Sequence, residues 1–149
     1  MPYRHLPLIS DTDLAAARRE LGPALPRILG YFRHDGVASI LAIENAMQAR
    51  NATALVLPAH SLKGESRQLG AERVAHLAEH LEMTARRCIE DRSDLPEALS
   101  DDVRGLRPLF HDTITLLESA VGPDAPLMAP TFRARPVAPQ RPVFGRRSN

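Results

Sequence analysis

His60, Lys63, Gly64 and Arg67 follow one another at spacings of three, one and three residues near the middle of the 149-residue sequence. On a helix, these spacings place all four residues on one face. His60 offers a nucleophilic ring nitrogen, and Lys63, the only lysine in the chain, offers a compact positive charge. Gly64 removes the side chain one turn from the imidazole, although a glycine inside a helix costs about 1 kcal/mol relative to alanine. The pattern indicates an exposed nucleophile beside a positive charge, on a surface that another molecule approaches closely.

The helix that carries this face is predicted to begin after Asn51, which can cap it, and to end at Gly70. Mostly apolar residues recur along it at spacings of three and four, which indicates a buried face: Leu55, Ala59, Leu62, Ser66 and Leu69. His60 lies about 100° from Ala59 around the helix, so its side chain is expected to be accessible to solvent. Pro58 removes one hydrogen bond and is expected to bend the helix just ahead of His60.

Apolar residues at the same spacing predict four other helical stretches. Their approximate ranges are 12–21, 25–50, 71–89 and 96–121. In the stretch 25–50, residues 34–36 are expected to break the helix, with Val37 and Leu41 facing inward after the break. In the stretch 71–89, Glu82 falls on the solvent-facing side. Pro108 is expected to kink the last stretch.

The fold class that follows is all-α, an antiparallel up-down four-helix bundle with a short N-terminal helix and a disordered C-terminal tail. Three regions are expected: an N-terminal cap helix in residues 1–22, a helical bundle in 23–121 and a Pro/Arg-rich tail in 122–149. The tail pairs aromatic residues with arginines, as in 132–135 and 142–147. Such a segment is either a solvated extension or a docking segment for an acidic surface.

Charge is divided unevenly between the bundle and the tail. Residues 1–121 hold 14 Lys and Arg against 17 Asp and Glu, a net charge of −3, whereas residues 122–149 hold five arginines against Asp124, a net charge of +4. A nucleic-acid-binding domain concentrates cations on its folded surface, so no nucleic-acid partner is expected. The one cysteine, Cys88, cannot form an internal disulfide, and no apolar run is long enough to span a membrane. A cytoplasmic protein without membrane contact is therefore expected.

Three segments together resemble a known family: His60-Ser61-Leu62-Lys63-Gly64, then Leu69-Gly70-Ala71, then the helix that contains Leu77, Leu81 and Glu82. Between Leu25 and Val121 the sequence resembles the histidine-containing phosphotransfer (Hpt) domain of multistep two-component signalling. The resemblance implies a four-helix bundle whose exposed histidine receives a phosphoryl group from an aspartate of one receiver domain. The histidine then passes the group to an aspartate of another receiver.

The resemblance also implies roles for individual residues. His60 matches the phosphorylated histidine, Lys63 the lysine that favours the charged phosphoryl group, and Gly64 the glycine that lets the receiver approach. Glu82 stands where family members often have a Gln or Glu that orients the imidazole. Arg67 and Gln68 are expected to support the site. Ser61 and Glu65 are expected to contact the partner, and Glu65 departs from the small residue usual at its position.

The partners that the resemblance implies are response-regulator receiver domains and a hybrid histidine kinase. The protein is expected to act as a monomer and as a phosphoryl carrier without kinase activity, because the sequence has no Gly-rich nucleotide loop. It needs no cofactor of its own, since the partner receiver supplies Mg²⁺.

Three other interpretations compete with this one. His76-Leu77-Ala78-Glu79-His80 has the spacing of a zinc metallopeptidase motif, but a small bundle offers neither a third ligand nor a cleft, so no metal site is expected. A dimeric histidine-kinase bundle also carries a phosphorylated histidine, but Ser61 and Gly64 fit the transfer domain better. The third is an adaptor on the same fold that binds a response regulator without phosphorylation.

Overall fold

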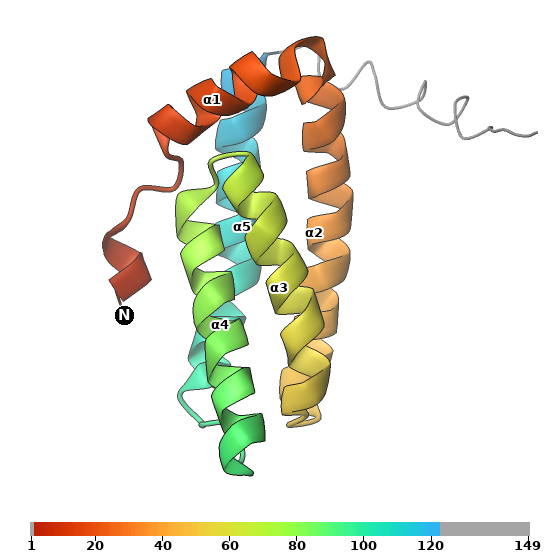
Figure 1. Cartoon of the computed structure of the whole chain (residues 1–149), viewed down its shortest axis with the longest axis vertical. Coiled ribbons are helices and arrows are strands. Elements are labelled where there is room, and N and C mark those ends of the chain that lie inside the picture. The colour runs from red at the N-terminus through yellow and green to blue at the C-terminus, as the bar shows by residue number, and fades with distance from the viewer. Residues whose placement is uncertain (1, 123–149) are drawn as a thin grey trace, which may run out of the picture.

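The structure is a computed structural model that describes residues 2–122. Its helices are η1 (Pro2–His5), α1 (Asp11–Leu21), η2 (Gly22–Ala24), α2 (Leu25–Gln48), α3 (Ala52–Gln68), α4 (Glu72–Asp91) and α5 (Leu99–Val121). Helices α2 to α5 run up and down beside one another, and α1 crosses one end of them (Figure 1). This confirms the predicted all-α four-helix bundle with a short N-terminal helix. The predicted disordered tail lies outside the described residues.

The start of α3 is fixed by Asn51, whose Oδ1 accepts a hydrogen bond from the amide of Ala54 at 3.1 Å. The helix then continues through Pro58 without interruption. The apolar face predicted for α3 is confirmed, since each of its five residues is at most 1% exposed. That face packs into a core with the following side chains from the other three helices: Ile40, Ile43, Leu77, Leu81, Leu106 and Leu117. Burial of this face fixes the rotation of α3 and leaves its opposite side to solvent.

The prediction that residues 34–36 break the helix was wrong, because α2 runs without interruption from Leu25 to Gln48. Gly36 is buried and faces the core, where it packs against the ring of Phe110 on α5. This contact offsets the cost of a glycine inside a helix. The inward face therefore runs through Gly36 and Ile40, and Val37 and Leu41 fall outside it, 44% and 52% exposed. Their predicted inward orientation was wrong.

Replacing Gly36 with alanine is expected to destabilise the fold by about 2 kcal/mol, as overpacking of a filled core does. A Cβ atom at this position would overlap Cζ of Phe110, so the ring has to move. The change is measured by urea unfolding. Gly30→Ala is the matched control, because a Cβ on Gly30 in the same helix meets no atom within 4 Å and is expected to leave the protein as stable or slightly more stable.

The N-terminal segment is tied to the turn between α3 and α4. The amide of Ser10 donates to the carbonyl oxygen of Gly70 at 2.8 Å, and the amide of Glu72 donates to that of Leu8 at 3.0 Å. Gly70 has a φ of +77°, and a Cβ there would lie 2.9 Å from the backbone nitrogen of Leu14. The glycine predicted to end α3 therefore also lets α1 lie close against the turn.

A buried carboxylate holds the first residues of the chain to the bundle. Asp102 on α5 is 1% exposed, and it accepts a hydrogen bond of 2.5 Å from the hydroxyl of Tyr3. Nε2 of His80 on α4 lies 3.3 Å from its other oxygen. Burial and the bond to Asp102 raise the pKa of Tyr3 above its ordinary value. Nothing in the sequence pattern indicated this contact, which joins residues 99 positions apart.

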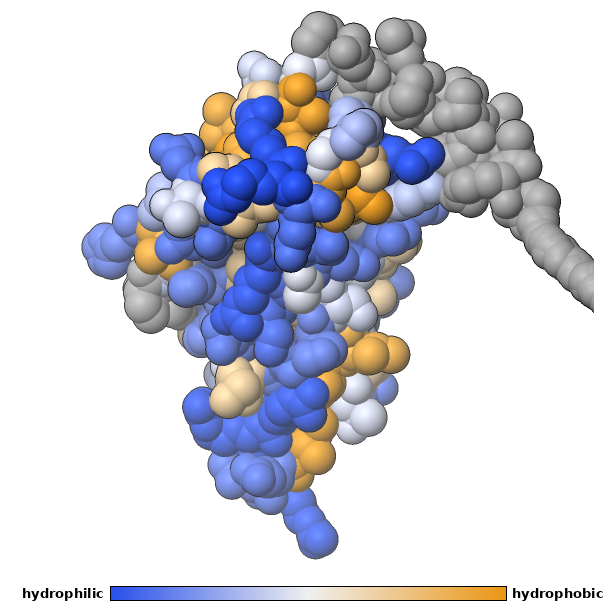
Figure 2. Space-filling model, turned by 45° about the horizontal axis from the view of Figure 1, so that its top comes forward, coloured by the Kyte–Doolittle hydropathy of each residue, from blue (hydrophilic) through white to orange (hydrophobic). Residues whose placement is uncertain are grey.

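On the face that Figure 2 shows, most of the described surface is hydrophilic, with hydrophobic residues gathered in a few patches. The large apolar side chains that stay exposed are Val37, Leu41, Leu57, Met83, Ile89 and Leu116. None of the helices between residues 2 and 122 combines the length and the apolar character that crossing a membrane would require.

Candidate functional site

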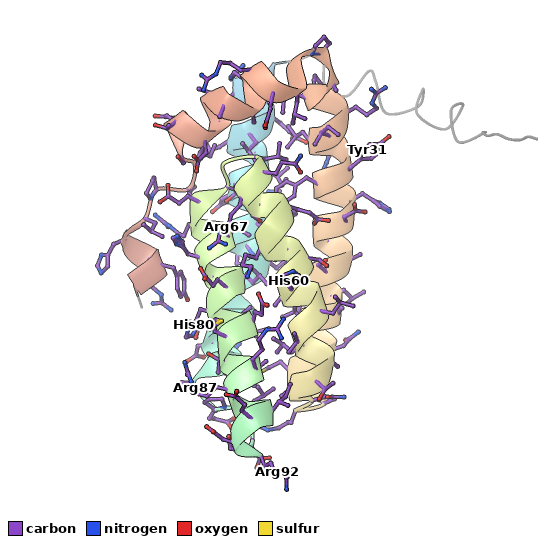
Figure 3. All side chains as sticks on the ribbon, in the orientation of Figure 1. Tyr31, His60, Arg67, His80, Arg87 and Arg92 are labelled. Carbon is purple, nitrogen blue, oxygen red and sulfur yellow. The ribbon has the colours of Figure 1, made fainter. Side chains whose placement is uncertain are left out.

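The predicted nucleophile lies on the outer side of α3, where α3 packs along α4. The side chain of His60 is 56% exposed, as predicted. Figure 3 shows it midway along the bundle, with Arg67 further along α3 toward the end that α1 crosses. The apolar face behind it is buried from Leu55 to Leu69, so the backbone that carries the imidazole is held rigidly while the ring remains accessible.

One carboxylate on α4 connects the groups around the imidazole. Oε2 of Glu82 lies 3.0 Å from Nδ1 of His60, and Oε1 lies 2.8 Å from Nζ of Lys63. Arg86, one turn along α4, donates from Nε at 3.0 Å and lies 2.8 Å away through Nη2, both to Oε2. A single acidic side chain therefore contacts two cations and the ring.

Glu82 is 3% exposed, which corrects its predicted place on the solvent-facing side of α4. The prediction failed because α3 packs over this part of α4 and covers the carboxylate. Burial alone would raise the pKa of Glu82, but the bonds from Lys63, Arg86 and His60 outweigh it and lower the pKa to about 2. Glu82 is therefore a carboxylate at neutral pH.

The charge of Glu82 decides which ring nitrogen of His60 is free. An ionised carboxylate can only accept hydrogen bonds, so in the neutral imidazole Nδ1 must carry the hydrogen that Glu82 accepts. The lone pair is then on Nε2, the nitrogen on the far side of the ring from Glu82. A ring held in one tautomer, with its acceptor nitrogen directed away from the Glu82 carboxylate, is suited to nucleophilic attack from solvent.

Lys63 is less exposed than its predicted place in an exposed row suggests, since its side chain is 17% exposed. Its ammonium group reaches Oε1 of Glu82, whose other oxygen contacts the imidazole. The cation is therefore already positioned next to His60 before any anionic group arrives.

Gly64 is exposed, and a Cβ atom there would meet no atom of the chain within 4 Å. Nothing within the described protein therefore requires a glycine at this position, unlike Gly36 and Gly70. A requirement from outside, such as the close approach of another molecule, accounts for it better. Leu57, one turn before His60, is 70% exposed and extends the same surface with an apolar side chain.

The other predicted site residues lie further from the ring. Nη2 of Arg67 is 2.7 Å from Oε1 of Glu79, so its guanidinium is already paired, and Gln68 is exposed near the end of α3. Ser61 and Glu65 are half-buried. Burial raises the pKa of Glu65, and the charge of Asp35 on α2 adds to the shift.

The sequence interpretation missed Arg86 as part of the site. The signal that would have found it is the spacing of four between Glu82 and Arg86, which places the two side chains one turn apart on a helix. That spacing is common on solvated helix faces. It indicates a site residue only because Glu82 is buried in the structure.

The residues of the zinc-type motif His76–His80 that form ion pairs do so with other side chains. Glu79 pairs with Arg67, and His80 contacts Asp102 on the other side of α4. Between residues 2 and 122, no three His, Cys, Asp or Glu side chains gather as a metal ion would need.

Two comparisons with known proteins give a match. The Hpt domain family matches residues 27–120 of the chain. Among solved structures, histidine-containing phosphotransfer protein B (HptB) from Pseudomonas aeruginosa PAO1 is similar, with a TM-score of 0.67 and 26% sequence identity. The similarity covers 76% of this chain and 94% of that chain. The sequence has no match among curated proteins.

Proposed function

The chain belongs to the Hpt domain family and has a histidine phosphotransfer role in two-component signalling, and from this premise we propose that His60 carries the phosphoryl group between receiver-domain aspartates. The observation that supports this most is the half-exposed imidazole of His60, whose Nδ1 lies 3.0 Å from the buried Glu82 carboxylate. That contact leaves Nε2 as the nucleophile.

In the proposed transfer, Nε2 attacks the phosphorus of an aspartyl phosphate on the receiver. A bond forms between Nε2 and phosphorus, while the bond between phosphorus and the aspartate oxygen breaks and the carboxylate leaves with its electron pair. Nδ1 keeps its hydrogen, so the ring becomes positively charged. The ionised Glu82 offsets that charge, and the same steps in reverse deliver the group to a second receiver.

Lys63 offers the positive charge that the phosphoryl group needs. A phosphoryl group on His60 brings nearly two negative charges, and the ammonium group is already beside the ring, 2.8 Å from Glu82. We propose that Lys63 turns toward the phosphoryl oxygens when they arrive. Phosphoryl transfer depends mostly on positioning and charge stabilisation, and the receiver supplies its own acidic pocket with Mg²⁺. The chain therefore needs no cofactor and no kinase activity of its own.

We propose that the receiver docks over the outer face of α3. Gly64 leaves open space there, Leu57 offers an apolar contact, and the chain acts as a monomer. Ser61 and Glu65 border this face, and they select among receivers and the hybrid kinase.

Replacing Glu65 with alanine is then expected to change the ranking of a panel of receivers by the rate at which each exchanges a phosphoryl group with the protein.

The test is a transfer assay with a phosphorylated receiver domain, using the full chain and the variant His60→Gln. Label that is stable in base and labile in acid is expected on the unmodified chain and absent from the variant. If no receiver of the organism transfers label to the correctly folded protein, the proposal is wrong, and the chain is instead an adaptor that binds a response regulator without phosphorylation.

A further inference from the structure

Arg86 contacts the same oxygen of Glu82 that meets the imidazole. Its Nε and Nη2 lie 3.0 and 2.8 Å from Oε2, and Nδ1 of His60 lies 3.0 Å from that oxygen. Lys63 contacts the other oxygen, Oε1. Of the three groups that face the carboxylate, His60 and Lys63 come from α3, and Arg86 comes from α4 itself. Because Arg86 shares a helix with Glu82, its contact does not depend on what happens on α3.

This arrangement matters once a phosphoryl group is attached to His60, as the proposed function requires. The new negative charges attract Lys63, which comes from α3 like His60 and shares the Glu82 carboxylate with it. If Lys63 leaves Glu82, the carboxylate stays buried with one cation fewer. Burial favours the protonated acid, and a protonated Glu82 would no longer offer the charge that offsets the ring.

We infer that Arg86 is a positioning residue, which keeps Glu82 ionised and directed at Nδ1 of His60 while Lys63 moves from Glu82 to the phosphoryl group. The inference rests on the proposed function. It assigns different tasks to the two cations on one carboxylate: Lys63 is the exchangeable partner and Arg86 the permanent one. Geometry supports the assignment, because two guanidinium nitrogens of Arg86 contact Oε2, whereas Lys63 contacts Oε1 through a single ammonium group.

The alternative is that Arg86 forms an ordinary surface pair along one helix, since its side chain is 54% exposed. Such a pair would contribute slightly to stability and nothing to the chemistry. The two possibilities differ in what happens to Glu82 and to the ring of His60 when the guanidinium is removed.

The experiment compares Arg86→Met with Arg87→Met in the full chain. Methionine keeps the apolar stem, and Arg87 is the adjacent arginine, exposed and without an ion pair among the residues described. Three quantities are measured: the rate of phosphoryl transfer from a phosphorylated receiver, the titration of the Glu82 carboxyl carbon by ¹³C NMR, and the ¹⁵N shifts of the His60 ring.

Arg86→Met is expected to lower the transfer rate about tenfold. It is also expected to move the Glu82 titration up from about 2 toward the ordinary value of 4.5, and to reduce the population of His60 with its hydrogen on Nδ1. Arg86→Lys is expected to recover most of the rate, and Arg87→Met to match the unmodified chain in all three readouts. Arg86→Gln is measured as a second variant, in case methionine disturbs the helix, and the same three changes are expected for it.

Equal transfer rates and equal Glu82 titrations in Arg86→Met and Arg87→Met would overturn the inference. A failure of the proposed function is distinguishable, because the unmodified chain would then take no label. The Glu82 titration and the His60 ring shifts would still decide whether Arg86 positions the carboxylate.

Discussion

Replacing Lys63 with alanine is expected to lower the rate at which His60 accepts a phosphoryl group by about 100-fold, the usual cost of losing one group that stabilises charge in a transition state. The ammonium group comes from α3, like the ring, and lies 2.8 Å from Oε1 of the Glu82 that contacts the ring. Without it, the arriving phosphoryl oxygens lose the cation that is free to turn toward them, because Arg86 stays on Oε2 of Glu82. Rapid-quench measurement of label on the chain, from a phosphorylated receiver, gives the rate.

Arg67→Ala is the matched control for Lys63→Ala. Arg67 lies one turn beyond Lys63 on α3, and its guanidinium is paired with Glu79 at 2.7 Å. Its removal is expected to change the transfer rate by no more than about twofold, as loss of an exposed ion pair normally does. If Lys63→Ala transfers as fast as Arg67→Ala, the electrostatic role given to Lys63 is incorrect.

Replacing Glu82 with glutamine is expected to reduce phosphoryl transfer about 30-fold, within the range seen when a group that orients a reactive side chain is lost. A neutral amide cannot offset the positive ring, and its NH₂ group faces donors instead of accepting from them. The protein is also expected to lose about 2 kcal/mol of stability, because the amide satisfies the surrounding donors less well than the carboxylate. Transfer kinetics and urea unfolding at neutral pH measure the two effects.

The same variant changes how stability depends on pH. The folded-state pKa of Glu82, about 2, is below its ordinary value of 4.5, so the folded protein binds this proton less readily than the unfolded chain. The carboxylate therefore stabilises the fold fully above pH 4.5, and this contribution, about 3 kcal/mol, is lost as the pH falls toward 2. Glu82→Gln is expected to flatten the acid side of the stability curve between these values. An equally steep acid side in the variant would show that Glu82 is not the group responsible.

The outer face of α3 could be predicted from the sequence because helical periodicity fixes it locally. The buried residues from Leu55 to Leu69 recur at a regular spacing, so the position of His60 on the opposite side follows from helix geometry alone. The cap at Asn51 and the glycine after the helix are equally local signals. Each depends on residues fewer than five positions apart.

Contacts between helices were the part that local patterns could not predict. Glu82 reads as a solvated residue on α4, and it becomes buried only because α3 lies over it. The sequence around Gly36 predicts a break in the helix. In the structure Gly36 instead makes room for the ring of Phe110 on α5, a contact that local spacing does not reveal. The contact of Tyr3 with Asp102 likewise depends on where the first residues of the chain return to the bundle.

The predicted site follows the same division. The resemblance directed attention to Glu82. The geometry of its carboxylate depends on two helices and on Arg86, which local spacing did not distinguish from an ordinary surface residue. The predicted row of exposed residues was similarly incomplete, because Lys63 reaches across to α4 and is largely covered.

The ionised Glu82 is expected to hold Nδ1 of His60 and to leave Nε2 to carry the phosphoryl group. The most direct test is ¹⁵N and ³¹P NMR of the ¹⁵N-histidine-labelled chain, after phosphorylation by a receiver domain. A single phosphohistidine at His60, with coupling between phosphorus and Nε2 and a hydrogen retained on Nδ1, is the predicted result. Phosphorus bound to Nδ1, or to any residue other than His60, would contradict the account.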